Sequence, residues 1–376
     1  MATLILTCNT GEGHNSCAKA IKEVYDAHGE ACEIMDALLF VSEWFSGFAH
    51  RVHTSMYQNH PKVFRVGYGF TQKHNGLTTT KGSFPYWVLN KGVDRLHAYI
   101  QEHHITTIIC VHPLLMMLLT AFEEKYGKIC KTAYVSTDYT CCPGVSDSHP
   151  QFCFIPDKSL KENFCCENIR PEQIIVSGIP VRQQFYQKHD KTIAKNLFGI
   201  PEETPHLLMM CGSMGCGPME ELLDLLDALN CFIDVHITLV CGTNERLKCT
   251  LSEKYANSDN MHIQGYISEI SQLMDSADLF ITKPGGLSST EAAVKCVPMV
   301  FVDAVGGCED RNMEYFLSSG CAVSGKTPSD ITNHCMALLQ EPERLENMSD
   351  ALRHLQIPNA AEIIFETMRL QKEAKI

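Results

Sequence analysis

The sequence lacks any apolar run long enough to cross a membrane. The longest near-apolar stretch, residues 108–122, is interrupted by His112 and Pro113, and a spanning helix needs roughly 20 apolar residues. The first residues, MATLILTCNTGEGH, also lack the basic region and the small-residue cleavage site of a signal peptide. We therefore predict a strand that runs into a loop at the N-terminus, and no transmembrane segment.

The chain has 19 cysteines but no CxxC spacing, so the sequence gives no sign of a zinc module. The adjacent pairs Cys141–Cys142 and Cys165–Cys166 cannot clip long loops, and many other cysteines lie inside apolar runs as small hydrophobic residues. This usage is typical of a protein kept reduced in the cytoplasm and not of a secreted disulfide framework.

Positive charge is scarce. The chain has 31 Lys and Arg against 44 Asp and Glu, and its net charge of −13 argues against a nucleic-acid partner. The excess acid falls on residues 171–376, because residues 1–170 carry 15 basic and 16 acidic side chains. Residues 44–95 differ from the rest: they hold seven basic residues against one acid, a local charge of +6, together with ten aromatic residues.

Strand-like runs alternate with helical patterns in two blocks, which is typical of parallel α/β sheets. The runs that predict strands are 3–8, 105–111, 133–137, 152–155, 174–176, 206–210, 235–240, 279–281 and 299–302. A chain of 376 residues suits two or three domains of roughly 100–200 residues each. We predict two doubly wound α/β domains, at 1–185 and 200–350, and an amphipathic terminal helix over 355–376.

Glycine-rich loops join strands to helices in both blocks, where backbone N–H groups and the helix dipole can bind an anion. They do not match GxGxxG or GxxxxGK[ST], which disfavours the common NAD and P-loop sites. Taken alone, the loop Gly212–Gly217 fits a simple turn equally well. The loop that leads to Glu291 is more specific, because its glycines and hydroxyls can take a diphosphate and Glu291 can bind a ribose. Alternatively, Ser289 or Thr290 caps the helix and Glu291 is a first-turn acid.

Three polar residues follow three predicted strands of the first domain, and we expect them at one edge of the sheet. His14 lies just after the first glycine loop, before a helix predicted to start near Asn15 or Ser16, and its side chain suits a general base near neutral pH. His112 and Asp138 join it. The alternatives are a packing role for His14 and a turn or helix cap for Asp138.

Eight short motifs occur in order along the chain: Asn9–Ala18, Val111–Leu114, Ser136–Tyr139, Gly178–Arg182, Gly265–Tyr266, Lys283–Ser288, Glu291–Ala292 and Glu309–Asn312. Together they resemble the monogalactosyldiacylglycerol synthases and bacterial diacylglycerol glucosyltransferases of glycosyltransferase family 28, over roughly residues 3–345. The resemblance implies a GT-B fold, in which two Rossmann-like domains face a central cleft and the C-terminal helix returns to the first domain. It also implies an inverting transfer of a hexose from a UDP-sugar to diacylglycerol or a glycolipid, without a cofactor and without a metal.

Carried over by position, the resemblance implies an acceptor site in the first domain and a donor site in the second. In the first domain, His14 and Asp138 are the candidate catalytic residues, and Gly11, Glu12, Gly13 and His112 surround the acceptor. In the second domain, the residues expected to bind the UDP-sugar are Gly212, Ser213, Gly215, Gly285, Gly286, Leu287, Ser288, Ser289, Glu291, Glu309 and Asn312. Of these, Glu291 is expected on the ribose, and Glu309 and Asn312 on the hexose.

The sequence departs from the family pattern at two places. The family usually has a glutamine where this chain has Cys308, and a thiol is a poor hydrogen-bond donor to a sugar. The first loop reads Gly-Glu-Gly where three glycines are usual, which places the Glu12 carboxylate near the acceptor or the diphosphate. Glu12 would therefore either weaken anion binding or act as a second base.

The basic, aromatic segment 44–95 fits a protein that docks on the inner face of the cell membrane. Basic residues near an anionic leaflet contribute about 1 kcal/mol each, and Trp and Tyr settle at the interface. The residues expected at the membrane are Arg51, Lys62, Arg65, Lys73, Lys81 and Trp87. The competing interpretation is that several of the aromatics belong to the core.

Two other functions remain open from the sequence. One is a GT-B transferase with a different lipid-linked acceptor, such as the lipid-linked muramyl-peptide N-acetylglucosaminyltransferase. The other is a protein that binds a nucleotide sugar without catalysis, which the thiol of Cys308 motivates.

Overall fold

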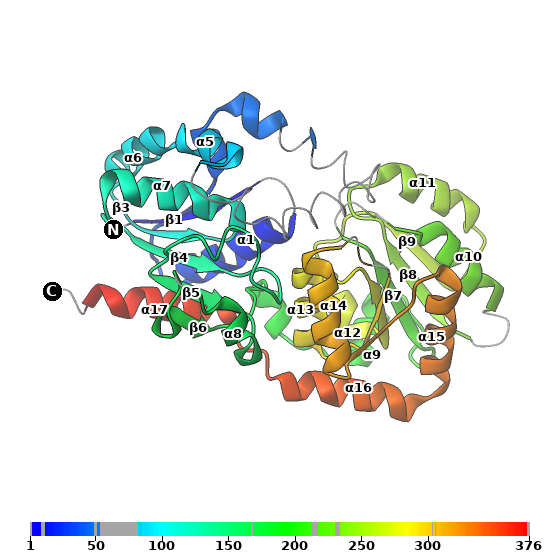
Figure 1. The fold of residues 1–376 in the computed structure, drawn as a ribbon. Helices are drawn as coiled ribbons and strands as arrows, with labels where there is room; N and C mark the ends of the chain where they lie inside the picture. Colours follow the sequence, from blue (N-terminus) through cyan, green and yellow to red (C-terminus); the bar gives the residue numbers. More distant parts are fainter. Residues whose placement is uncertain are drawn as a thin grey trace. The chain divides into compact units, whose positions relative to one another are not determined.

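The computed structural model describes residues 2–8, 12–48, 51–52, 82–166, 168–212, 215, 217–229, 234–302, 304 and 306–373. Residues 371–373 are described by their backbone alone. The chain divides into two units, which we describe separately (Figure 1). The first unit holds Met1–Gln183, Val305–Cys308 and Pro358–Ile376, and the second holds Gln184–Ala304 and Glu309–Ile357.

A six-stranded parallel sheet forms the centre of the first unit, with strand order β2-β1-β3-β4-β5-β6. Its strands are β1 (Ala2–Thr7), β2 (Cys32–Asp36), β3 (Ile105–Cys110), β4 (Lys131–Val135), β5 (Phe152–Ile155) and β6 (Ile174–Val176). Its helices are α1 (Glu12–Ala27), α5 (Phe84–Asn90), α6 (Val93–Glu102), α7 (Met116–Tyr126), α8 (Lys161–Phe164) and α17 (Ala360–Glu373).

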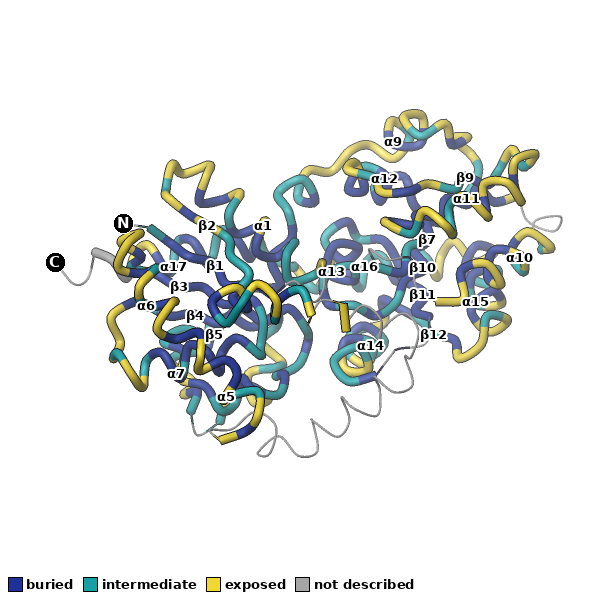
Figure 2. The backbone as a smooth tube through the Cα atoms, turned by 90° about the horizontal axis from the view of Figure 1, so that it is seen from above, coloured by how far each residue is buried: buried dark blue, intermediate teal, exposed yellow. Residues whose placement is uncertain are grey.

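Helices cover both faces of this sheet, so the inner strands are apolar on both sides (Figure 2). Leu4 and Leu6 pack on one face with residues of α5, α6 and α7. Ile5, between them, packs on the other face with residues of α1 and α17. Alternation along a strand therefore fills two hydrophobic cores from one run of sequence.

The C-terminal helix α17 packs against α1, as the edge-to-face rings of Tyr25 and Phe365, 4.9 Å apart between centroids, illustrate. The expected start of this helix at residue 355 is wrong, because α16 (Pro342–Leu355) ends there and Gln356 adopts a left-handed conformation. Pro358, just beyond, favours a break in the chain before α17.

The second unit has its own six-stranded parallel sheet, with strand order β12-β11-β10-β7-β8-β9. Its strands are β7 (His206–Met210), β8 (His236–Val240), β9 (Met261–Gln264), β10 (Leu279–Thr282), β11 (Met299–Phe301) and β12 (Ala322–Ser324). Its helices are α9 (Lys191–Leu197), α10 (Met219–Leu229), α11 (Glu245–Lys254), α12 (Ile270–Ser276), α13 (Gly286–Lys295), α14 (Cys308–Ser318), α15 (Pro328–Gln340) and α16; the first residue of α14, Cys308, belongs to the first unit. The predicted α/β fold with two parallel sheets and a returning C-terminal helix is confirmed.

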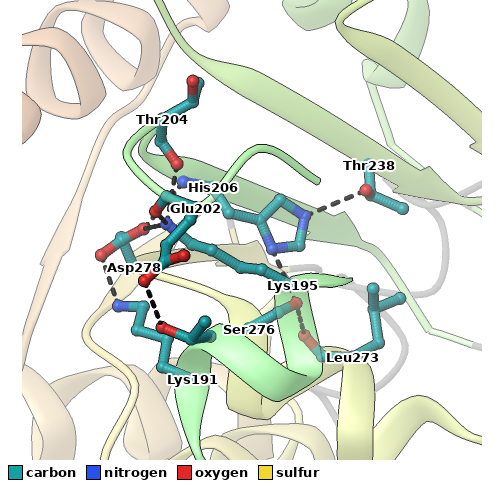
Figure 3. A network of polar contacts seen from close by, with 10 residues as sticks. Lys191, Lys195, Glu202, Thr204, His206, Thr238, Leu273, Ser276 and Asp278 are labelled. Carbon is teal, nitrogen blue, oxygen red and sulfur yellow. Dashed lines mark hydrogen bonds and ion pairs between the residues drawn. The ribbon is translucent and has the colours of Figure 1, made fainter. Parts of the chain in front are cut away.

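A buried polar network ties the start of the second unit to its sheet (Figure 3). The Lys195 ammonium donates to the carbonyls of Glu202 and Thr204 at 2.9 and 2.8 Å, and the Asp278 carboxylate accepts from the backbone N–H of His206 at 2.8 Å. The His206 ring lies between the hydroxyls of Thr238 and Ser276, at 2.9 and 3.0 Å. Burial lowers the pKa of His206 to about 3, so this ring stays neutral in the native protein.

Among the described residues, no helix is long and apolar enough to cross a membrane. The seventeen cysteines in the described part of the chain are all free thiols.

Candidate active site

The first turn of α1 places His14 at the carboxyl edge of the first sheet. Its Nδ1 atom lies 2.9 Å from the backbone carbonyl oxygen of Val111, which follows β3, and 3.1 Å from the hydroxyl of Thr137, which follows β4. A carbonyl oxygen can only accept, so Nδ1 carries the proton and donates it to Val111. The neutral ring therefore holds its lone pair on Nε2, the form that a general base requires.

His112 has the opposite tautomer. The backbone N–H of Leu114 donates to His112 Nδ1 at 3.2 Å, which caps the 3-10 turn Pro113–Leu115, so the proton of the neutral ring is on Nε2. The centroids of the His14 and His112 rings are 4.4 Å apart. The structure thus brings two of the three predicted strand-end residues into contact and gives His112 a clear capping role.

The expected start of the first helix is wrong. The helix begins at Glu12 and not near Asn15 or Ser16, so Glu12 and Gly13 belong to the first turn of α1. The Glu12 side chain is exposed at a helix N-terminus, where the dipole favours a carboxylate. Gly11 lies outside the described residues.

Asp138 lies at the same sheet edge, directly after Thr137. The Ser136 hydroxyl donates to its backbone carbonyl at 2.8 Å, and the Cys142 thiol is 4.0 Å from its carboxylate. The thiols of Cys142 and Cys308 lie 3.1 Å apart, and Cys308 packs against the core of the first unit. Mutual contact and burial raise the pKa of Cys142 well above its ordinary value, so it is a thiol and not a thiolate.

Asp138, Cys142 and Cys308 form one group whose possible metal-ligand atoms lie within 4.8 Å of one another. Two thiols and a carboxylate suit a soft cation such as Zn²⁺, whereas Mg²⁺ and Mn²⁺ on a diphosphate prefer oxygen ligands. The donor set therefore does not fit the usual diphosphate-binding metals.

In the second unit, the glycines of the loop after β7 are structurally required. Gly212 and Gly215 have φ angles of 70° and 56°, which disfavour other residues. A Cβ atom on Gly215 would lie 2.6 Å from the carbonyl oxygen of Cys241, closer than packing permits. The chain therefore makes a tight turn at the carboxyl edge of the second sheet, while Ser213 lies outside the described residues.

The loop after β10 leads into α13 without a side-chain cap. The N-cap is Gly285, which has no side chain to cap the helix, so the N–H groups of Gly286, Leu287 and Ser288 have no partner within the helix. The alternative that Ser289 or Thr290 caps the helix is wrong, because both lie inside it and the Thr290 hydroxyl donates to the Gly286 carbonyl at 2.6 Å.

The interior of α13 carries polar groups that a core helix does not need. Glu291 is only 5% exposed and lies beyond the first turn, so its interpretation as a first-turn acid is also wrong. Within the described part of the chain, the hydroxyls of Ser289 and Thr282 are buried and have no hydrogen-bond partner. Buried polar groups usually have a hydrogen-bond partner, so these two hydroxyls are polar positions at the end of β10 and inside α13 that packing alone does not explain.

Helix α14 carries Glu309 and Asn312, the remaining residues predicted to bind the UDP-sugar. Glu309 forms an ion pair with Lys283, with Nζ and Oε1 2.8 Å apart. Asn312 is fully buried, and its side-chain amide donates to the carbonyl of Pro284 at 3.1 Å, so it holds the loop that precedes α13. Contact of either residue with a hexose remains a prediction.

Both halves of the chain match known families. Residues 14–181 match the family described as monogalactosyldiacylglycerol (MGDG) synthase, and residues 206–364 match the glycosyltransferase family 28 C-terminal domain. The chain thus pairs an MGDG synthase domain with a glycosyltransferase family 28 C-terminal domain. Among its curated relatives, proteins named processive diacylglycerol β-glucosyltransferase from Bacillus pumilus and Bacillus subtilis are 29% and 26% identical to it. Each alignment covers 98% of this chain and 95% of the relative.

Solved structures support the GT-B fold of this protein. MurG of Acinetobacter baumannii superposes with a TM-score of 0.65 at 14% identity, over 98% of this chain and 99% of that one. Staphylococcus aureus MnaA, solved with UDP, gives 0.63 at 12% identity, over 99% and 96%. At these identities the likeness concerns the fold alone.

Two residues of the candidate site, Thr137 and Lys283, were not predicted from the sequence. Thr137 contacts His14, and its only signal was its place between two motif residues after a strand. Lys283 was part of a quoted motif, but nothing in the sequence showed that it faces Glu309.

The segment expected at a membrane is only partly described. Lys62, Arg65, Lys73 and Lys81 lie outside the described residues, whereas Arg51 is exposed. The side chains of Trp44, Phe48, Phe84 and Trp87, which we call the aromatic surface, are 44–73% exposed, and the Lys91 ammonium lies 3.6 Å from the centre of the Trp87 ring. Phe45 and Tyr86, by contrast, pack against the core, so the competing interpretation holds for these two.

Proposed function

We propose that this protein is an inverting glycosyltransferase that moves a hexose from a UDP-sugar to diacylglycerol or a glycolipid. The observation that carries the proposal is the match of the first unit to the MGDG synthase family, together with near-full-length relatives named processive diacylglycerol β-glucosyltransferase. The chemistry proposed for each unit follows from its own residues.

The acceptor is activated by His14. Its Nδ1–H is held by the Val111 carbonyl, so Nε2 takes the proton of the lipid hydroxyl as that oxygen attacks the anomeric carbon of the hexose. The bond between this carbon and the diphosphate breaks, and its electron pair leaves with UDP. General-base catalysis of this kind typically contributes about 10²–10⁴-fold. Asp138 is the second candidate for the base that accepts this proton.

The donor is held by the second unit without a metal. The N-terminus of α13 and the loop of Gly212 and Gly215 receive the diphosphate through backbone N–H groups and the helix dipole. Glu291 accepts from the ribose hydroxyls, while Glu309 and Asn312 face the hexose. The unpartnered hydroxyl of Ser289 supports this placement, because a bound nucleotide would satisfy it.

The acceptor resides in a membrane, and we place the protein on the cytoplasmic face as a peripheral enzyme. The aromatic surface and the basic residues of 44–95 belong to the acceptor unit, and a few inserted rings with nearby cations give weak, reversible docking. An enzyme that exchanges lipid substrates needs this reversibility.

Incubation with labelled UDP-glucose, UDP-galactose or UDP-N-acetylglucosamine and diacylglycerol vesicles tests the proposal. We expect label in a diacylglycerol glycolipid. Label only in a lipid-linked muramyl peptide, when that acceptor is supplied, would favour the alternative transferase. UDP-sugar binding without transfer to either acceptor would favour a binding protein.

A further inference from the structure

The Lys283 side chain lies between the two glycine loops of the second unit. A Cβ atom placed on Gly212 would be 3.0 Å from Lys283 Cε, and one placed on Gly285 would be 3.7 Å from the same carbon. Both glycines precede helices at the carboxyl edge of the sheet, where α13 presents its uncapped N-terminus. An ammonium at this position adds a full positive charge to an edge that already favours anions.

This ammonium is paired with a carboxylate. Lys283 Nζ lies 2.8 Å from Glu309 Oε1, and the two side chains are 23% and 13% exposed. Glu309 belongs to the first turn of α14, where the helix dipole stabilises its charge. A largely buried ammonium without a counter-ion would be costly. The Glu309 carboxylate offsets this cost and so keeps the Lys283 ammonium at this position.

We propose that Lys283 is the cation that binds the donor diphosphate, and that Glu309 holds it in place until the donor arrives. This inference rests on the proposed function. A diphosphate oxygen replaces Glu309 Oε1 on the ammonium, and the released carboxylate oxygen becomes available to a hexose hydroxyl. One exchange therefore accounts both for the ion pair and for the expected contact of Glu309 with the sugar.

The same lysine serves the departure of UDP. When the anomeric carbon loses its bond to the diphosphate, the electron pair moves to a phosphate oxygen and the negative charge there grows. Lys283 and the first N–H groups of α13 offset this charge without a metal ion. Removing one preorganised electrostatic group of this kind typically lowers turnover by about 10²–10³-fold.

The test compares UDP binding by titration calorimetry in the parent and in three variants, at two salt concentrations. In Lys283→Met, we expect UDP to bind at least tenfold more weakly and with less dependence on salt, because one charge contact is lost. Lys283→Arg should restore most of the affinity. Glu309→Gln should bind UDP several-fold more tightly, because the competing carboxylate is gone, while its turnover falls.

Lys254→Met is the matched control, since Lys254 is another ion-paired lysine of the second unit, bonded to Glu220 and Asp224. We expect it to bind UDP like the parent. Failure of the parent itself to bind UDP would overturn the proposed donor class. If the parent binds UDP but Lys283→Met binds it equally well, with the same salt dependence, only the role of Lys283 is overturned. If Lys283→Met does not fold, unchanged or weaker UDP binding in Glu309→Gln overturns that role instead.

Discussion

The Nδ1 atom of His14 lies 2.9 Å from the carbonyl oxygen of Val111. This hydrogen bond joins the first turn of α1 to the end of β3 and fixes the tautomer of the ring. His112, whose ring centroid is 4.4 Å away, has the opposite tautomer because it accepts from the Leu114 N–H. His14 thus has its protonated nitrogen committed to a backbone carbonyl and its basic nitrogen on the other side of the ring, whereas the Nδ1 lone pair of His112 is used by a backbone N–H.

We expect His14→Ala to lose most of the turnover and to keep UDP binding, because the base and the donor site belong to different units. The loss should be about 10²–10⁴-fold, the usual contribution of a general base. Steady-state transfer rates and the UDP-induced rise in melting temperature measure the two effects. Near-normal turnover in this variant would move the base to Asp138, Glu12 or His112, and Asp138→Asn would be the next variant to test.

UDP alone should raise the melting temperature of the protein. A ligand that binds only the native state stabilises it by about 2.7 kcal/mol at 100 times its Kd. In Glu291→Ala the shift should shrink, because the ribose loses its acceptor, and EDTA should leave the shift of the parent unchanged. Absence of any shift at millimolar UDP would remove the donor-site assignment, and loss of the shift with EDTA would show that a metal takes part.

Mild acid should destabilise the second unit through His206. Its pKa is about 3 in the folded protein and about 6.5 when unfolded, so the unfolded chain binds the proton first as the pH falls. The free energy of unfolding therefore decreases below about pH 6.5, by about 2 kcal/mol between pH 7 and pH 5 from this residue alone. Burial lowers the pKa of His236 to about 4, which acts in the same direction.

Urea unfolding of the parent and of His206→Gln at pH 7 and pH 5 measures this effect. The loss of stability on acidification should be about 2 kcal/mol smaller in the variant. Equal losses in the two proteins would mean that His206 is not excluded from protonation in the native state.

Vesicles with anionic lipid should bind the protein despite its net charge of −13. The Debye length is about 8 Å at physiological salt, so the acids of the second half are screened from a membrane that touches residues 44–95. Salt should weaken binding but not abolish it, because the aromatic contribution is not electrostatic. Cosedimentation at increasing salt measures both contributions.

Replacing Arg51, Lys62, Arg65, Lys73 and Lys81 by Gln should reduce vesicle binding and lipid turnover while the UDP-induced melting shift is kept. Trp44→Ser together with Trp87→Ser should remove part of the salt-resistant binding, since both rings are more than half exposed. Full cosedimentation of the charge variant would assign the basic residues to packing and contradict the membrane interpretation.

Central strands were easier to predict from the sequence than edge strands. The apolar runs 206–210 and 279–281 match β7 and β10, which are buried on both faces. Three of the four edge strands in the described sheets, β2, β9 and β12, were not predicted. Each has at most one buried residue, so polar side chains interrupt the apolar pattern on which the prediction depends.

The sequence predicted which loops carry the candidate site, but not which side chains contact one another there. Position after a strand singled out His14 and Glu291, because ligands bind at the carboxyl ends of parallel strands. The tautomer of His14 and the pairing of Lys283 with Glu309 depend on side chains far apart in the sequence. The start of α1 at Glu12 was missed because two glycines around it suggested a loop.

Proton NMR of the lipid product tests the central claim most directly. The protein is incubated with a UDP-α-hexose and diacylglycerol vesicles, and the coupling of the anomeric proton in the extracted glycolipid is measured. A single displacement with His14 as base predicts a hexosyl diacylglycerol with the large coupling of a β-linkage. A product with the small coupling of an α-linkage, or the absence of any glycosylated diacylglycerol, would contradict the account.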